Sequence, residues 1–130
     1  MSSSTAPFRY GRFAVFALIA GAINLVLFFV GGALGGAMAV NSPALLEIPF
    51  FAAFGSTVTP LLIAGFITWL IGKKAPKFVN VAAWLGLVFA LVSIASPLMV
   101  AVDMTTGIVL AAMHIVAGLG WFLGIKRSAN

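Results

Sequence analysis

The chain has 130 residues, of which 63% are hydrophobic and only 7% are charged, with a net charge of +5. An average soluble domain carries about 25% charged residues, so this chain lacks the polar surface that would cover a soluble core. The composition excludes a soluble enzyme, a disordered tail and a nucleic-acid binder, and it makes the lipid bilayer the solvent. With no cysteine in the sequence, disulfides and thiolate metal sites are excluded as well.

Four apolar stretches of spanning length follow one another along the chain. A helix that crosses the bilayer needs about 20 predominantly apolar residues, and the predicted spans cover residues 13–36, 49–72, 78–96 and 104–125. Pro49 suits the first turn of the second helix, and Pro97 is expected to end the third. The first stretch is too long for the apolar region of a cleaved signal peptide, which is about 7–15 residues. We therefore predict an all-α, four-helix transmembrane bundle.

The bundle forms one domain of residues 13–125, with tails of residues 1–12 and 126–130. In an even-numbered bundle all seven basic residues fall on one side: Arg9, Arg12, Lys73, Lys74, Lys77, Lys126 and Arg127. The positive-inside rule makes that side cytoplasmic. Both tails are then cytoplasmic (N-in and C-in), and Glu47 and Asp103 lie outside. The localisation that follows is a multi-pass protein of the plasma membrane, whose positive charge records its insertion direction and contacts anionic headgroups.

Small residues recur at the spacing that lets membrane helices approach closely. We interpret this spacing as contacts between helices of the same chain. The alternative is a homodimer face or a slot for a lipid or quinone tail. The predicted helix-packing glycines are Gly31, Gly32, Gly35, Gly36, Gly86, Gly120 and Gly124.

A few polar residues lie deep within the predicted spans. Asn24 and His114 are each roughly 16 Å from the cytoplasmic end of their helix, so a hydrogen bond between them is allowed if the first and fourth helices touch. Pro60 breaks the hydrogen bonding of the second helix, and nearby hydroxyls could satisfy the freed carbonyl. The candidate polar intramembrane site, which we expect to form an outward-facing cavity, consists of Asn24, Ser56, Thr59, Ser93 and His114.

The fourth helix carries one small or polar stripe that should face the bundle. The stripe contains Thr106, Gly107, Leu110, His114, Ala117, Gly118 and Trp121. Asp103, just before this helix, is expected to act as its N-cap rather than as a catalytic acid.

His114 is a candidate functional residue because ionisable groups inside the membrane are costly. A proton-coupled site, a haem or metal ligand and a quinone partner are each incomplete, because the sequence has one His, no Cys and no carboxylate at that depth. The favoured alternative is a neutral histidine, hydrogen-bonded to Asn24 or to a hydroxyl of the second helix. We predict no catalytic residues, no metal site, no cofactor and no enzymatic activity.

Several segments together resemble a family of small membrane proteins, mostly actinobacterial. The segments are Ala22–Leu27 with Gly31–Gly35, Thr59–Leu62, the basic loop Lys73–Lys77 with Trp84, Ser96–Leu98, Asp103–Thr106 and Leu110–His114. The family is uncharacterised, with four predicted spans, so the resemblance implies an architecture and a bacterial plasma membrane, and no activity.

Two functions compete on these observations. The leading hypothesis is a noncatalytic interaction or accessory subunit that packs against itself or against a larger membrane complex. The alternative is binding of a lipid, quinone or cation in an outer-half polar cavity near His114, or proton-coupled transport through it.

Overall fold

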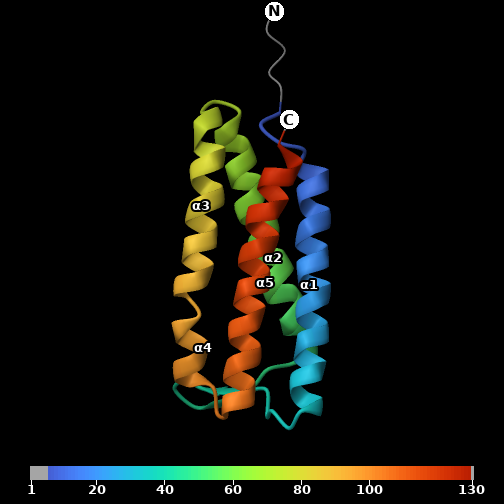
Figure 1. Cartoon of the computed structure of the whole chain (residues 1–130), viewed down its shortest axis with the longest axis vertical. Helices are drawn as coiled ribbons and strands as arrows, with labels where there is room; N and C mark the ends of the chain where they lie inside the picture. The colour runs from blue at the N-terminus through green and yellow to red at the C-terminus, as the bar shows by residue number, and fades with distance from the viewer. Residues whose placement is uncertain (1–5, 130) are drawn as a thin grey trace, which may run out of the picture.

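A computed structural model describes residues 6–129 and confirms the all-α bundle of four membrane-spanning helices (Figure 1). The helices are α1 (Tyr10–Ala33), α2 (Phe50–Gly72), α3 (Pro76–Val92), α4 (Ala95–Val100) and α5 (Met104–Ser128). Helix α4 continues the direction of α3, so that Pro76–Val100 forms the third span. Because each span is long and apolar enough to cross a membrane, the chain is a multi-pass membrane protein in contact with the lipid bilayer.

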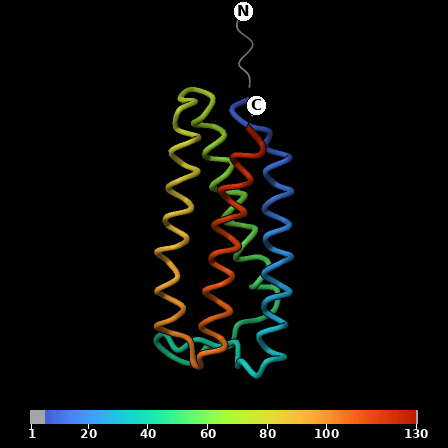
Figure 2. Tube along the Cα trace, in the orientation of Figure 1, coloured from blue at the N-terminus to red at the C-terminus, as the bar shows by residue number. Residues whose placement is uncertain are grey.

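The two ends of the bundle differ in composition. The tube in Figure 2 places both chain termini and the α2–α3 connection at one end, which we call the basic end because it carries the seven basic residues. The opposite end, the hairpin end, holds an antiparallel pair of short strands, β1 (Ala39–Asn41) and β2 (Leu45–Glu47). Strands of only three residues leave no periodic signal in a sequence, so this hairpin could not be predicted. Of the predicted tails, residues 1–5 and 130 lie outside the described residues.

Helix α1 begins and ends earlier than residues 13–36. It starts at Tyr10, so Arg12 is helical, and it ends at Ala33. The N–H of Gly36 donates to the carbonyl of Gly31 at 2.9 Å, and that of Gly35 donates to Gly32 at 3.1 Å. This pair of bonds is a Schellman cap, which needs a left-handed residue, and Gly35 has a φ of +94°. The glycine-rich segment therefore ends the helix.

Pro97 lies inside α4 instead of ending the third span. A proline ring clashes with the carbonyl four residues earlier, which here belongs to Ser93, and the helix is broken at Ser93–Ile94. The Ser93 hydroxyl donates to the Ala90 carbonyl at 2.8 Å. The proline thus acts four residues upstream, and the span continues past it to Val100.

The packing toward the basic end is centred on Phe13. This fully buried ring lies against Gly65 of α2 and Gly124 of α5, where a Cβ atom would collide with it. It also makes an edge-to-face contact with Trp121, with ring centroids 5.6 Å apart. Close approach at glycines therefore brings α1 against both α2 and α5.

Asp103 organises the hairpin end and is the N-cap of α5, as predicted. Its carboxylate accepts hydrogen bonds from the N–H of Thr106 at 2.7 Å and from the N–H of Ala37 at 2.9 Å. The bond from Thr106, and then that from Ala37, lowers the pKa of the carboxyl group below its ordinary value of 3.8. The side chain therefore ties the start of α5 to the segment between α1 and β1.

The lowered pKa predicts a pH-dependent stability. A carboxyl group with a depressed folded-state pKa contributes stability above its unfolded-state pKa, and this contribution is lost as the pH falls through the folded-state value. We expect the melting temperature of the wild-type protein in detergent to drop below pH 3.8 relative to Asp103→Asn, which keeps a capping oxygen but does not titrate. Parallel pH profiles of the two proteins would contradict this role.

Candidate functional site

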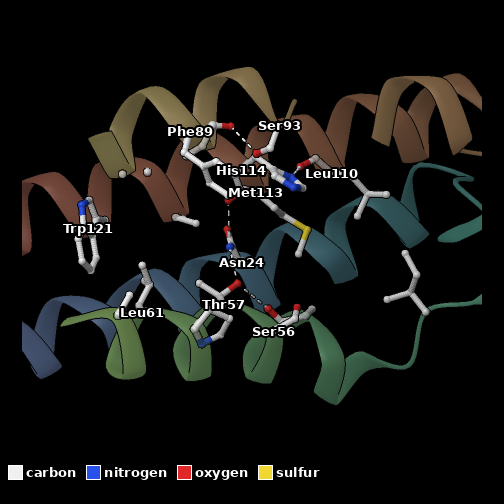
Figure 3. A pocket seen from close by; sticks show the side chains of 18 residues that line it. Asn24, Ser56, Thr57, Leu61, Phe89, Ser93, Leu110, Met113, His114 and Trp121 are labelled. Atoms are coloured by element: carbon white, nitrogen blue, oxygen red, sulfur yellow. Dashed lines mark hydrogen bonds between the residues drawn. The ribbon is translucent and has the colours of Figure 1, made fainter. Parts of the chain in front are cut away.

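A cavity of about 530 Å³ lies among α1, α2, α3 and α5. Its volume falls within the range of about 300–1,000 Å³ typical of small-molecule sites. Figure 3 shows its 18 lining side chains: Asn24, Ile48, Ala53, Ser56, Thr57, Pro60, Leu61, Ala64, Gly86, Phe89, Ala90, Ser93, Leu110, Met113, His114, Ala117, Gly118 and Trp121. Most of these are apolar, so the wall offers a few polar groups within a hydrophobic surface.

The cavity opens sideways between α2 and α3. Its lining residues on α2 and α3 include exposed ones, such as Ser56, Pro60 and Phe89, of which Phe89 is 75% exposed. The lining residues Asn24 of α1 and Met113 of α5 are buried. Helices α1 and α5 therefore form the floor, and the mouth lies within the membrane-spanning part of the bundle.

Asn24 is the most deeply buried polar residue of the cavity floor. Its side chain is 1% exposed and lies between α2 and α5 in Figure 3. The Nδ2 group donates to Thr57 Oγ1 at 2.8 Å and to the Met113 carbonyl at 3.1 Å. Both amide hydrogens are therefore used, while Oδ1 has no hydrogen-bond partner in the structure. A buried acceptor without a donor is costly in hydrocarbon.

His114 lies on the α5 wall with one ring nitrogen engaged. Its Nδ1 is 2.7 Å from the Leu110 carbonyl oxygen. Because a carbonyl only accepts, Nδ1 must carry the hydrogen, and in the neutral ring Nε2 is then an acceptor. The allowed Asn24–His114 hydrogen bond is not formed, since the bonds of each side chain go elsewhere. His114 is bonded neither to Asn24 nor to a hydroxyl of α2.

The hydroxyl groups of the wall are bonded to their own helices. Thr57 donates to the Ala53 carbonyl at 3.0 Å, and Ser56 donates to the Ala52 carbonyl. These bonds differ from the expected one, because neither hydroxyl reaches the Ser56 carbonyl that Pro60 leaves without a helical donor. Helix α2 nevertheless runs unbroken through the proline.

Trp121 limits the cavity on the side of the basic end. Its indole Nε1 donates to the Ala82 carbonyl at 2.9 Å. Gly86 makes room for the ring, because a Cβ atom there would overlap the indole. The contact also joins α3 to α5.

The structure brings together four of the five predicted polar residues. Asn24, Ser56, Ser93 and His114 line the cavity, whereas Thr59 is exposed and does not line it. Sequence analysis missed Thr57, which bonds directly to Asn24. A signal existed, since small or hydroxyl-bearing residues recur at spacings of three, four or eight residues along the buried face of α2: Ala53, Thr57, Gly65, Thr68 and Gly72.

The predicted packing glycines divide into two groups. Five of them meet other parts of the same chain, namely Gly31, Gly36, Gly86, Gly120 and Gly124. A Cβ atom at Gly32 or Gly35 would have no described neighbour from another part of the chain within 4 Å. The α5 stripe does face the bundle as predicted, with Thr106, Gly107, Leu110, Gly118 and Trp121 buried.

The chemistry available at the wall is limited. Among residues 6–129 no three His, Cys, Asp or Glu side chains gather as a metal-binding group. His114 is the one titratable side chain among the described residues that line the cavity. The arrangement can hold a small molecule by apolar contact and by hydrogen bonds to a few fixed polar atoms.

The fold and the cavity together define a class: a small four-span membrane protein with a laterally open cavity. Within that class the chain belongs to a family described as "Family of unknown function (DUF6069)", whose model matches residues 4–130. The expected membership in an uncharacterised family is therefore confirmed. No curated protein and no solved structure matches the chain.

The two bonds of Asn24 predict a graded loss of stability. A hydrogen bond between membrane helices contributes about 0.6 kcal/mol on average and up to about 1.7 kcal/mol. We expect Asn24→Leu, which removes both bonds, to lower the free energy of unfolding in detergent by about 1–2 kcal/mol, and Thr57→Val to lower it by about half as much.

Thr59→Val is the matched control, because Thr59 is exposed on the same helix. It should leave the unfolding free energy unchanged. Equal effects of Thr57→Val and Thr59→Val would show that the Asn24–Thr57 bond does not stabilise the bundle.

Proposed function

We propose that this protein binds a small lipid-soluble molecule in the cavity between α2 and α3, without catalysing a reaction. The observation that carries the proposal is the cavity of about 530 Å³ with Asn24 and His114 on its wall. Small-molecule sites in proteins are mostly apolar clefts of this size with a few polar groups on the wall. We infer that a cavity of this size in a chain of 130 residues holds a small molecule.

The position of the mouth supports entry from the bilayer. Exposed residues of α2 and α3 border the cavity, and both helices belong to membrane-spanning segments. An apolar wall holds water poorly, so an occupant that is itself dissolved in the membrane gains contacts without leaving hydrocarbon. Lateral entry therefore requires no aqueous path.

The competing interaction hypothesis has less support from the packing. The small-residue faces that could serve such contacts are mostly occupied within the chain; for example, Gly118 meets Ala90, and Gly120 meets Ala20. A second copy or a larger membrane complex would have to use other surfaces. Proton-coupled transport is also less favoured. A proton relay usually needs several titratable groups, and His114 is the single titratable side chain among the described residues that line the cavity.

We propose that the cavity catalyses no reaction, because its polar groups are not arranged as a nucleophilic site. A nucleophilic site needs a base and an orienting group next to the nucleophile. The Ser93 and Ser56 hydroxyls instead donate to backbone carbonyls, and His114 Nδ1 bonds a carbonyl rather than an acid.

We further propose that the basic end faces the cytoplasm of a bacterium, in its plasma membrane. Support comes from the seven basic residues at that end and from Glu47 and Asp103 at the other. An actinobacterial source stays a prediction from the sequence resemblance.

Native mass spectrometry after gentle extraction tests the binding proposal. The wild-type protein should retain a small apolar molecule, and Ala117→Leu, which adds volume at the cavity wall, should lose most of it. Ala22→Leu is the control, because Ala22 is exposed on α1 and does not line the cavity. Equal retention by the wild type and Ala117→Leu would refute the cavity as the binding site.

The absence of cysteine makes the orientation simple to test. An Ala44→Cys variant places one thiol on the exposed hairpin loop, and Lys74→Cys places one at the basic end. A membrane-impermeant maleimide should label Ala44→Cys in intact cells and Lys74→Cys only after permeabilisation. The reverse pattern would overturn the proposed orientation.

A further inference from the structure

The polar groups on the cavity wall share a property that specifies the ligand. Every side-chain N–H or O–H donor among the described lining residues is already bonded within the protein. The donors belong to Asn24, Ser56, Thr57, Ser93, His114 and Trp121. The wall therefore has no spare side-chain donor to offer an occupant.

Acceptors, in contrast, remain available. Asn24 Oδ1 has no partner, but it is buried too deeply beneath the cavity floor for an occupant to reach it. His114 Nε2 is an acceptor, because Nδ1 carries the hydrogen that binds Leu110. The Ser93 hydroxyl oxygen keeps its lone pairs after donating its hydrogen to Ala90. A molecule that enters this cavity is met by hydrogen-bond acceptors alone.

The assignment of the Asn24 amide supports this polarity. In the opposite orientation the amide oxygen would face the Met113 carbonyl, which also only accepts. It would also face the Thr57 oxygen, whose hydrogen is directed to Ala53. The observed orientation is the one that satisfies both neighbours, so Oδ1 is the atom left without a partner.

We propose that the ligand is an uncharged amphiphile with a hydroxyl donor, such as a lipid-soluble alcohol, phenol or hydroquinone. This inference rests on the proposed binding function and narrows it. The hydroxyl would donate to His114 Nε2 while the apolar body fills the cavity.

The same wall disfavours the other candidate classes. A carboxylate, a phosphate or an oxidised quinone brings acceptors to a wall of acceptors, and its polar atoms would lose their donors on entry. A cation would enter without a counter-charge, because no Asp or Glu is among the described residues that line the cavity. A neutral donor is the one class that satisfies the wall and is itself satisfied.

A matched set of probes tests the proposal on the full chain in detergent. Para-octylphenol and para-octylanisole share a skeleton, but the ether has lost the donor. Para-octylbenzoate is an anion of similar size. The para-octyl-N,N,N-trimethylanilinium ion is the corresponding cation. Trp69→Phe with Trp84→Phe leaves Trp121, which lines the cavity, as the one fluorescent indole of the three.

Titration of Trp121 emission, corrected for partition into detergent, gives the dissociation constants. We expect the phenol to bind about tenfold more tightly than the anisole, as one buried hydrogen bond would give, and more tightly than both ions. His114→Phe should reduce this preference, and Thr59→Val, outside the cavity, should preserve it. The comparison of phenol and anisole binding in the protein with His114 intact tests the ligand class even if His114→Phe does not fold.

The two proposals fail in different ways. If the anisole, the anion or the cation binds as tightly as the phenol, the ligand class is overturned while the cavity remains a binding site. If no probe changes the Trp121 emission in a saturable manner, the proposed binding function itself is overturned, and the inference with it.

Discussion

The side-chain amide of Asn24 is the interaction on which the arrangement of the site depends. From α1 it bonds Thr57 of α2 and the Met113 carbonyl of α5, so three helices meet at one buried polar group. In hydrocarbon such a group must find partners inside the protein. Helix α3 takes no part in this junction and is instead held to α5 through Trp121 and the Ala82 carbonyl. The space between α2 and α3 is left open as a result, and the cavity lies there.

The hydrogen bonding of a membrane helix explains the polarity of that cavity. Serine and threonine hydroxyls in a helix donate readily to the carbonyl of the preceding turn, as Thr57 does to Ala53 and Ser93 to Ala90. His114 follows the same rule through Nδ1 and Leu110. Each such bond consumes a donor and leaves an acceptor. Polar groups in a membrane helix must form hydrogen bonds within the protein, and this requirement also determines which ligands the cavity can recognise.

Much of the architecture could be predicted from the sequence, because the length of each apolar run and the positions of the charged residues can be seen in it directly. Local terminations were less predictable. The Gly31–Gly36 segment caps α1 in addition to the close packing that Gly31 and Gly36 make as predicted, and Pro97 breaks the helix at Ser93, four residues upstream. The depth of Asn24 and His114 could be calculated from the helix rise, but their partners could not. Hydrogen bonding depends on rotation about each helix axis, which apolar spans encode weakly; hence Thr57 was missed and Thr59 was included.

The position of the hydrogen on the His114 ring decides whether the cavity wall carries a free donor. A wall that presents acceptors and no free donor requires the hydrogen of neutral His114 to lie on Nδ1. The chain has one histidine, so nitrogen-15 solid-state NMR of labelled protein in bilayers at pH values where the ring is neutral needs no further assignment. We expect a protonated Nδ1 and an unprotonated Nε2. A spectrum with the hydrogen on Nε2 would place a donor on the wall and contradict this expectation.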